Sequence, residues 1–137
     1  MLPLKSKIGT RSHHYEEEVT EKRIVDFCKA VGMSDTSKAP PTFLTVFRKG
    51  EFDLLQMLHL KLSNALHAEQ EYDYEDSIRA GDRVRFETVV AQVVEKQSST
   101  GRLQFLVLET EFEALHNGVS RRVGKAKSTI VFKERTH

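Results

Sequence analysis

The spacing of apolar residues changes after residue 64, and this change limits the possible folds more than any other feature of the chain. From residue 66 to residue 74, apolar and polar residues alternate, which is typical of a strand with one buried face. Segments rich in valine, leucine and other strand-forming residues follow at 83–97, 102–115 and 119–134. The second half of the chain therefore predicts a sheet of long strands.

Turn signals separate these strands. The sequence "RAGD" at 79–82 contains Gly81, which is free to adopt positive φ, and "SSTG" occupies 98–101. Asn117-Gly118 is the strongest short-range hairpin signal that a sequence offers. Because short turns join antiparallel neighbours, we expect the sheet to be antiparallel.

Two helical regions precede the sheet, and the first covers 19–32. Thr20 can cap its start, and Gly32 can take the left-handed conformation that often ends a helix. The apolar stripe of this helix consists of Ile24, Phe27, Cys28 and Val31.

The segment 42–62 is the most apolar in the chain and predicts the helix at the centre of the core. Phe43 and Phe47 indicate a first helical piece, and Gly50 indicates an interruption. A second piece, from about 51 to 61, is apolar on most sides, which is normal for a helix wrapped by other structure. Its apolar residues are Phe52, Leu54, Leu55, Met57, Leu58 and Leu60.

Helices followed by a run of antiparallel strands are typical of the α+β class. In the last strand, Gly124, Ala126 and Ser128 share one face with Ile130 and Phe132. Their small side chains would let a helix approach the sheet closely. We therefore predict a hot-dog fold, in which a five-stranded antiparallel sheet wraps around the central apolar helix.

Length and composition limit the possible partners. A chain of 137 residues suits one hydrophobic core, so we expect a single domain over 1–137 in which residues 1–14 form an extension. Its 21 basic and 20 acidic residues leave a net charge of +1, which favours neither nucleic acid nor a membrane surface as a partner. No apolar run suits a signal peptide or a membrane span, so we expect a cytoplasmic protein. Cys28 is the only cysteine, and His13-His14 lack a further spaced ligand, so we expect no metal and no cofactor.

Four segments of the chain carry a family resemblance: "RIVDFCKAVG", "APPTF", "LHAEQEYDYEDSIRAGDRVRFETVV" and "GKAKSTIVF". In this order they resemble the N-terminal half-domain of MaoC-like dehydratases, over residues 15–134. That family has the hot-dog fold and includes (R)-specific enoyl-CoA hydratases and 3-hydroxyacyl-thioester dehydratases. The resemblance therefore implies a lyase of fatty acid metabolism that acts on acyl-CoA or acyl-carrier-protein thioesters.

The chain differs from active members of this family at one important place. Those members carry an Asp and a His in a D-x-N-P-x-H-like segment after the first helix, and the two residues handle the proton and the water. Here only "MSDTSK" separates Gly32 from "APPTF", so Asp35 stands without an Asn-Pro and without a nearby His. The resemblance predicts a chain that lacks its own catalytic pair and shapes the acyl site within a homodimer, or within a heterodimer whose C-type subunit supplies the pair. Whether the chain is an enzyme alone stays open.

A row of charged residues alternates with the apolar residues of the strand at 66–74. A row of this kind is most often the solvated or interfacial face of a sheet, and a catalytic array is the other interpretation. His67 is a weak catalytic candidate because an imidazole exchanges protons near neutral pH, and Asp35 is the other. A structural histidine and a turn aspartate are the simpler alternatives. The charged row consists of His67, Glu69, Glu71 and Asp73.

Candidate substrate-binding residues come from the resemblance and from charge. The resemblance implies an acyl-thioester site after "APP", where backbone N–H groups would polarise the thioester carbonyl. Its residues are Pro41, Thr42, Phe43 and Val46. A basic cluster suits either CoA phosphates or a solvated strand edge. Its residues are Arg121, Arg122, Lys125 and Lys127.

Two other functions remain open from the sequence. One is a homodimer that binds an acyl group or an acyl carrier without catalysis. The other is a hot-dog thioesterase, which would need an acid on the core helix, where Glu51 and Asp53 are the only ones. Acids also favour the start of a helix for purely structural reasons.

Overall fold

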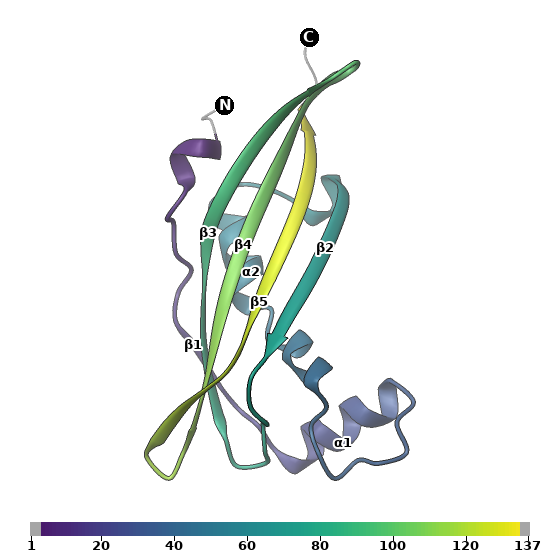
Figure 1. Ribbon diagram of the computed structural model, residues 1–137, viewed down its shortest axis with the longest axis vertical. Coiled ribbons are helices and arrows are strands. Elements are labelled where there is room, and N and C mark those ends of the chain that lie inside the picture. Colours follow the sequence, from purple (N-terminus) through teal and green to yellow (C-terminus); the bar gives the residue numbers. More distant parts are fainter. Residues whose placement is uncertain (1–3, 135–137) are drawn as a thin grey trace.

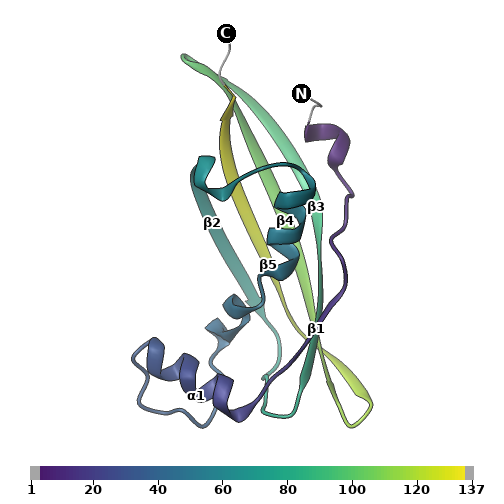
Figure 2. The same ribbon diagram turned by 180° about the vertical axis from the view of Figure 1, so that it is seen from behind.

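Residues 4–134, which the computed structural model describes, form a five-stranded antiparallel sheet that curves around one short helix (Figure 1). The strand order is β1-β3-β4-β5-β2, and the short helix, α2, lies on one face of the sheet (Figure 2). The elements, with η for a 3-10 helix, are η1 (Leu4–Lys7), β1 (Tyr15–Glu18), α1 (Glu21–Ala30), η2 (Pro41–Val46), α2 (Lys49–Met57), η3 (Leu62–Asn64), β2 (Ala65–Tyr74), β3 (Arg83–Ser98), β4 (Gly101–His116) and β5 (Val119–Glu134). The predicted five-stranded sheet with a helix at its face is confirmed.

The three long strands follow the local sequence signals closely. The bounds of β3, β4 and β5 agree with the predicted ranges to within about one residue. Gly81 has a φ of 94°, and the hairpin residues Asn117 and Gly118 have φ values of 51° and 78°. Positive φ at both central residues is what a two-residue hairpin turn of this type requires. The predicted turns are therefore confirmed.

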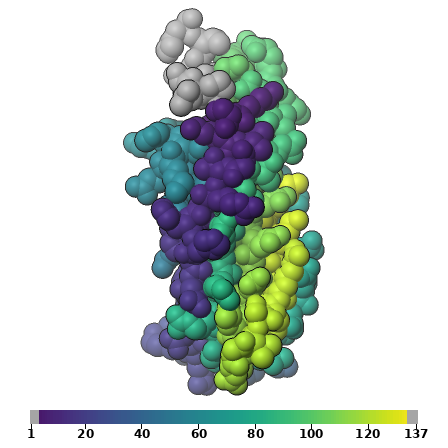
Figure 3. Space-filling model, turned by 90° about the vertical axis from the view of Figure 1, so that its left-hand side faces the viewer, coloured from purple at the N-terminus to yellow at the C-terminus, as the bar shows by residue number. Residues whose placement is uncertain are grey.

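The fifth strand, β1, has no clear signal in the sequence, and it belongs to an N-terminal segment that covers one sheet edge. From residue 4 on, the predicted extension 1–14 runs along β3 (Figure 3). Gly9 donates a hydrogen bond to the Val90 carbonyl (2.8 Å), and Ser12 donates one to the Thr88 carbonyl (2.8 Å). β1 then continues the pairing with the first residues of β3. The backbone of β3 is therefore paired on this side from Arg83 to Val90.

The central helix starts earlier and ends earlier than predicted. The sequence suggested about 51–61, whereas α2 covers Lys49–Met57. Gly50 lies within its first turn, so the interruption between the two helical pieces falls at 47–48 instead. Shortly after the end of α2, His59 adopts a left-handed φ of 57°, which a continuing helix does not allow.

The sheet covers only one side of α2. Leu54 and Leu55 are buried, but Phe52 and Met57 are 48% and 40% exposed. The prediction of a helix wrapped on most sides is therefore wrong for the single chain. A sheet on one side of a helix buries one stripe of it, and the outer side of α2 faces the viewer in Figure 2.

Gly50 allows α2 to approach the sheet very closely. A Cβ atom at this position would lie 2.3 Å from the Thr88 Oγ1 atom and 3.0 Å from the Thr88 Cβ atom. Thr88 is fully buried, and its hydroxyl shares a hydrogen bond with that of Thr110 (2.7 Å). Gly124 of β5 also allows a close approach, as predicted, but the side chain that packs against it is Leu44 of η2 and not one of the central helix.

The first helix, α1, has the predicted caps. The Thr20 side chain accepts a hydrogen bond from the Arg23 N–H (3.1 Å), and Gly32 has a φ of 78°. Cys28 is fully buried in the core. In residues 4–134, no helix has the length and apolar character needed to cross a membrane.

Candidate functional site

The open edge of the sheet, at β2, borders a groove of about 570 Å³. β2 pairs with β5 on one side, whereas its other side faces no strand of the described chain. The groove is lined by Arg48, Leu62, Ala65, Leu66, His67, Ala68, Glu69, Gln70, Ser128 and Ile130. Apolar side chains thus share this groove with five polar ones, which are Arg48, His67, Glu69, Gln70 and Ser128.

A buried carboxylate lies directly behind two of these polar groups, Arg48 and Ser128. Glu51, in the first turn of α2, is only 4% exposed. It accepts hydrogen bonds from the Arg48 guanidinium (2.9 and 3.2 Å) and from the Ser128 hydroxyl. The helix start favours a negative charge, and Arg48 compensates it further. The carboxylate is therefore held in a fixed position beside the groove.

Gln70 and Tyr72 of β2 extend this network toward the open edge. The best orientation of the Gln70 amide places its oxygen 2.7 Å from the Arg48 guanidinium and its nitrogen 2.6 Å from the Tyr72 hydroxyl. Burial and the negative charge of Glu51 raise the pKa of Tyr72, so its hydroxyl stays protonated at neutral pH. The network thus links the buried Glu51 carboxylate to the edge strand β2.

Within the charged row of β2, Glu71 and Asp73 lie on the opposite, outward face of the sheet, whereas His67 and Glu69 border the groove. Glu71 and Asp73 lie opposite Lys127 and Lys125 of β5 in the strand register. Cross-strand pairs of opposite charge stabilise a solvated sheet face. This register supports the simpler interpretation of the row, which is a solvent-exposed face of the sheet.

The apolar half of the predicted β2 pattern holds only at its end. Tyr72 and Tyr74 are half-buried, but Ala68 is exposed and Leu66 is 60% exposed. A β-bulge between Ala65 and His67 takes Leu66 out of register, and α2 is too short to cover the start of an edge strand. The sequence pattern could not show either feature.

The two weak catalytic candidates lie apart from each other. His67 stands at the rim of the groove with its Nε2 atom 3.2 Å from Glu69, and both side chains are more than half exposed. Asp35 lies in the exposed loop after α1, where it accepts hydrogen bonds from the hydroxyl (2.6 Å) and the N–H (3.0 Å) of Ser37. These hydrogen bonds lower the pKa of Asp35, and the one from the hydroxyl has the larger effect. The loop aspartate thus has the geometry of a turn residue.

The residues expected to bind the thioester form η2, one segment before α2. Pro41 and Thr42 are exposed, Val46 is half-buried, and Phe43 is buried against Phe27 with their ring centroids 5.4 Å apart. The Phe43 N–H donates a hydrogen bond to the Pro40 carbonyl (2.9 Å). The helix start that follows the two prolines is therefore the start of η2 and not that of the central helix.

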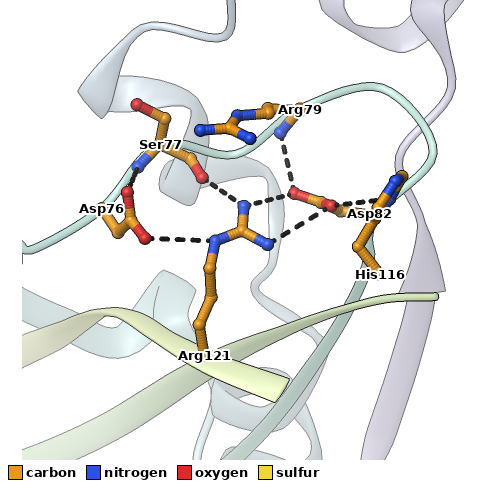
Figure 4. A network of polar contacts seen from close by, with 6 residues as sticks. All are labelled: Asp76, Ser77, Arg79, Asp82, His116 and Arg121. Carbon is orange, nitrogen blue, oxygen red and sulfur yellow. Dashed lines mark hydrogen bonds and ion pairs between the residues drawn. The ribbon is translucent and has the colours of Figure 1, made fainter. Parts of the chain in front are cut away.

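The basic cluster divides into two parts. Arg122, Lys125 and Lys127 lie on β5 among acids of the neighbouring strands, and Arg122 pairs with Glu75 (3.1 Å). Arg121 instead holds the connection between β2 and β3 (Figure 4). No shared phosphate site follows from this arrangement.

Arg121 binds a carboxylate that is almost completely buried. Its guanidinium donates to Asp82 (2.7 Å), to Asp76 (3.2 Å) and to the Ser77 carbonyl, as Figure 4 shows. Asp82 is 1% exposed and also accepts from the Arg79 N–H (2.9 Å). The hydrogen bond and charge of Asp82 raise the pKa of Arg121 despite partial burial. This cluster fixes the loop that joins the two strands.

An Asp–His pair that the sequence did not reveal joins α2 to the N-terminal segment. Asp53 accepts hydrogen bonds from the His13 backbone N–H (2.8 Å) and lies 2.7 Å from its Nδ1 atom. The side chain of His13 is 71% exposed, and neither residue lines the groove. The two positions are far apart in the chain, so only the folded structure brings them together. In the described residues, no cluster of His, Cys, Asp and Glu suits a metal ion.

Comparisons with known proteins agree on the fold and the family. Residues 6–119 match the family model described as "FAS1-like, dehydratase domain region". No curated protein matches the sequence. The structure is similar to the HadBC (3R-hydroxyacyl-ACP dehydratase) complex from Mycobacterium tuberculosis, with 16% identity, a TM-score of 0.64, and coverage of 91% of this chain and 96% of that chain.

Two further structures show the same fold. The ChsH1-ChsH2 complex from Mycobacterium tuberculosis is 14% identical, with a TM-score of 0.66 and coverage of 98% of this chain and 89% of that chain. A structure described as a MaoC-like dehydratase is 14% identical, with a TM-score of 0.68, and this chain spans 43% of its length. The predicted hot-dog fold is therefore confirmed.

Proposed function

Because the chain belongs to the FAS1-like dehydratase domain family, which is MaoC-like, we propose that it is one subunit of an acyl-thioester hydratase or dehydratase. In this proposal it shapes the acyl site, and a second chain supplies the acid and the base. The substrate is a 2-enoyl or 3-hydroxyacyl thioester of CoA or of an acyl carrier protein. The proposed location is the cytoplasm, where a lone reduced thiol such as buried Cys28 is normal.

The observation that carries this proposal is the position of the groove at the open edge of β2. One wall of the groove comes from β2, from Ser128 on β5 and from Arg48 before α2. The edge of β2 leaves the other side open for a second chain. Unpaired backbone groups on such an edge readily pair with another strand. A site at this place is completed when a partner adds its own residues.

The reaction assigns distinct roles to the two chains. In hydration, a base removes a proton from water, the water oxygen adds to the β-carbon of the enoyl thioester, and an acid protonates the α-carbon; dehydration is the reverse. Within this chain, the Arg48 guanidinium offers N–H donors to the thioester end, and Ile130 and Ala68 offer apolar surface to the acyl chain. The partner provides the proton-transferring pair.

The described residues support a partner-dependent role over independent catalysis. Asp35 is a poor base because its hydrogen bonds lower its pKa, and no His lies in its loop. The Asp53–His13 pair does not line the groove. The HadBC and ChsH1-ChsH2 structures are complexes, and we extend that arrangement to this chain with a C-type partner or a second copy.

A substitution that fills the groove tests the proposal. Ala68 lines the groove and is exposed, so Ala68→Trp blocks the groove without disturbing the core. In the complex purified with its partner, crotonyl-CoA hydration should fall about tenfold or more, because the substrate loses its position. The control Ala30→Trp places the same side chain at the exposed end of α1 and should leave the rate unchanged. Equal rates in both variants would contradict a site in this groove.

One specific observation favours a second candidate function, thioester hydrolysis. Glu51 is a buried carboxylate on the central helix beside the groove, where it could act as a base toward water. A thioesterase would hydrolyse saturated butyryl-CoA, and Glu51→Gln would abolish that activity. Binding of butyryl-CoA without turnover would instead support an acyl-binding dimer, the remaining alternative.

A further inference from the structure

Charges on the outward face of the sheet alternate in sign across the three strands β4, β5 and β2. Two acids of β4 face two lysines of β5, and these lysines face two acids of β2. The rows are Glu109–Lys127–Glu71 and Glu111–Lys125–Asp73. At β3 the alternation ends, because Glu87 lies opposite Glu111 and pairs instead with Arg11 and His14 of the N-terminal segment. Neighbouring strands of opposite sign stabilise each other, whereas like charges directly opposite each other are destabilising.

The alternation stops at an acidic strand that has room for another neighbour. Glu71 and Asp73 face outward from β2, Glu69 lies next to them at the border of the groove, and in the described residues no strand lies beyond them. The first half of the opposite edge, up to Val90 of β3, is already covered by β1 and by the segment before it. A strand that continued the pattern at β2 would carry basic residues on its outward face.

Pairing of β2 with its own copy does not continue this pattern. In an antiparallel two-fold pairing that keeps the sheet faces continuous, outward residues lie opposite outward residues. A register centred on Glu69 places this residue opposite itself, and one centred on Gln70 places Glu69 opposite Glu71. A register centred on Glu71 adds a pair between Glu69 and Asp73. Each central register therefore sets acid against acid.

We infer that the open edge of β2 selects a different chain, whose edge strand carries Lys or Arg at alternate, outward positions. This inference rests on the proposed function, because it names the chemistry of the partner at that same two-chain site. Like-charge repulsion weakens the self-paired dimer, and opposite charges favour the heterodimer.

The apolar surface beside the edge is continuous with this interface. Leu62 and Leu66 are 38% and 60% exposed, and both line the groove next to the backbone of β2. Burying them provides the apolar contact that a stable interface needs at its core. Charge then decides which strand pairs there, because electrostatic complementarity contributes mainly to specificity.

Neutralising the edge tests the inference without introducing new repulsion in the sheet. Sedimentation in 50 mM NaCl should show that Glu69→Gln/Glu71→Gln self-associates about fivefold more tightly than the unchanged chain. The control Glu109→Gln/Glu111→Gln removes the same net charge from the same face, away from the edge, and should change the self-association constant less than twofold. Both differences should shrink in 500 mM NaCl, because salt screens exposed charges.

A charge-reversed copy then serves as the basic partner. Glu69→Lys/Glu71→Lys, mixed with the unchanged chain, should form a mixed dimer about tenfold tighter than either chain forms alone. Thermal unfolding first shows whether the charge-reversed variant is folded. If it is not folded, the neutral variant Glu69→Gln/Glu71→Gln alone tests the inference.

The outcomes separate this inference from the proposed function. If the dissociation constant of the dimer is the same in the unchanged, neutral and mixed samples, the inference of charge selection is wrong, but the proposed two-chain site is not affected. Failure of every sample to associate at millimolar concentration overturns both, because the edge would then not be an interface.

Discussion

Replacing Gly50 by alanine tests the close contact between α2 and the sheet, on which the position of Glu51 depends. The new methyl group would lie 2.3 Å from the Thr88 Oγ1 atom and 3.0 Å from its Cβ atom. Thr88 is fully buried and hydrogen-bonded to Thr110, so it cannot rotate away without losing that bond. The start of α2 must therefore move outward.

The expected free-energy change combines two opposing effects. Alanine is favoured over glycine in a helix by about 1 kcal/mol. Overpacking a well-filled core costs typically about 1–3 kcal/mol, and a contact this short belongs to the upper part of that range. The variant should therefore unfold with a free energy about 1–2 kcal/mol lower than that of the unchanged chain. A loss of this size lowers the melting temperature by several degrees.

Urea unfolding followed by circular dichroism measures the effect, at one fixed protein concentration because association also stabilises the chain. The control Gln56→Ala lies on an exposed position of the same helix and should change stability by less than about 0.5 kcal/mol. In a Thr88→Ala background, the Gly50→Ala substitution should cost less, since part of the clash is removed. A Gly50→Ala variant as stable as the unchanged chain, or more stable, would refute the described contact.

Three further predictions follow from single contacts. Leu55→Ala should cost about 2–5 kcal/mol by leaving a core cavity, and a loss below about 0.5 kcal/mol in urea unfolding would argue against burial. Arg121→Ala should cost about 3 kcal/mol because a buried carboxylate loses its charge partner, whereas Arg122→Ala, at a half-exposed ion pair, should cost less than about 1 kcal/mol. Burial raises the pKa of Asp53, but the hydrogen bonds from His13 outweigh it and leave the pKa below its ordinary value. This pair therefore stabilises the fold above about pH 4, and the stabilisation is lost as the pH falls through the lowered pKa. When the free energy of unfolding is measured against pH, Asp53→Asn should reduce its loss at acid pH. A variant whose stability falls with pH as that of the unchanged chain does would contradict this prediction.

The sheet could be predicted from the sequence because its signals are local. The alternation of apolar residues in β3 and β4 and the hairpin pair Asn117-Gly118 each depend on neighbouring residues alone. The cap at Thr20 is equally local. Such features need no knowledge of what packs against them, and their predicted positions agree with the structure.

The errors have a common cause, which is tertiary contact. β1 has no alternation of its own and becomes a strand by pairing with β3, where Tyr15 stacks on Phe86 with ring centroids 5.6 Å apart. The bulge that exposes Leu66 is set by the register with β5.

The candidate site shows the same division between local and distant contacts. The Arg48–Glu51 pair is three residues apart on one helical turn, so the sequence could have suggested it. The contact of Glu51 with Ser128 depends on the fold, and sequence reasoning missed it.

Turnover by the isolated chain tests the central claim, that this chain forms only part of an acyl-thioester site. Purified protein without a partner is incubated with crotonyl-CoA, and the loss of the enoyl thioester is followed over time. The account predicts no hydration above the rate without protein, and hydration once the partner is added. Robust turnover by the chain alone, abolished by His67→Ala or Asp35→Asn, would contradict the account and make that residue catalytic.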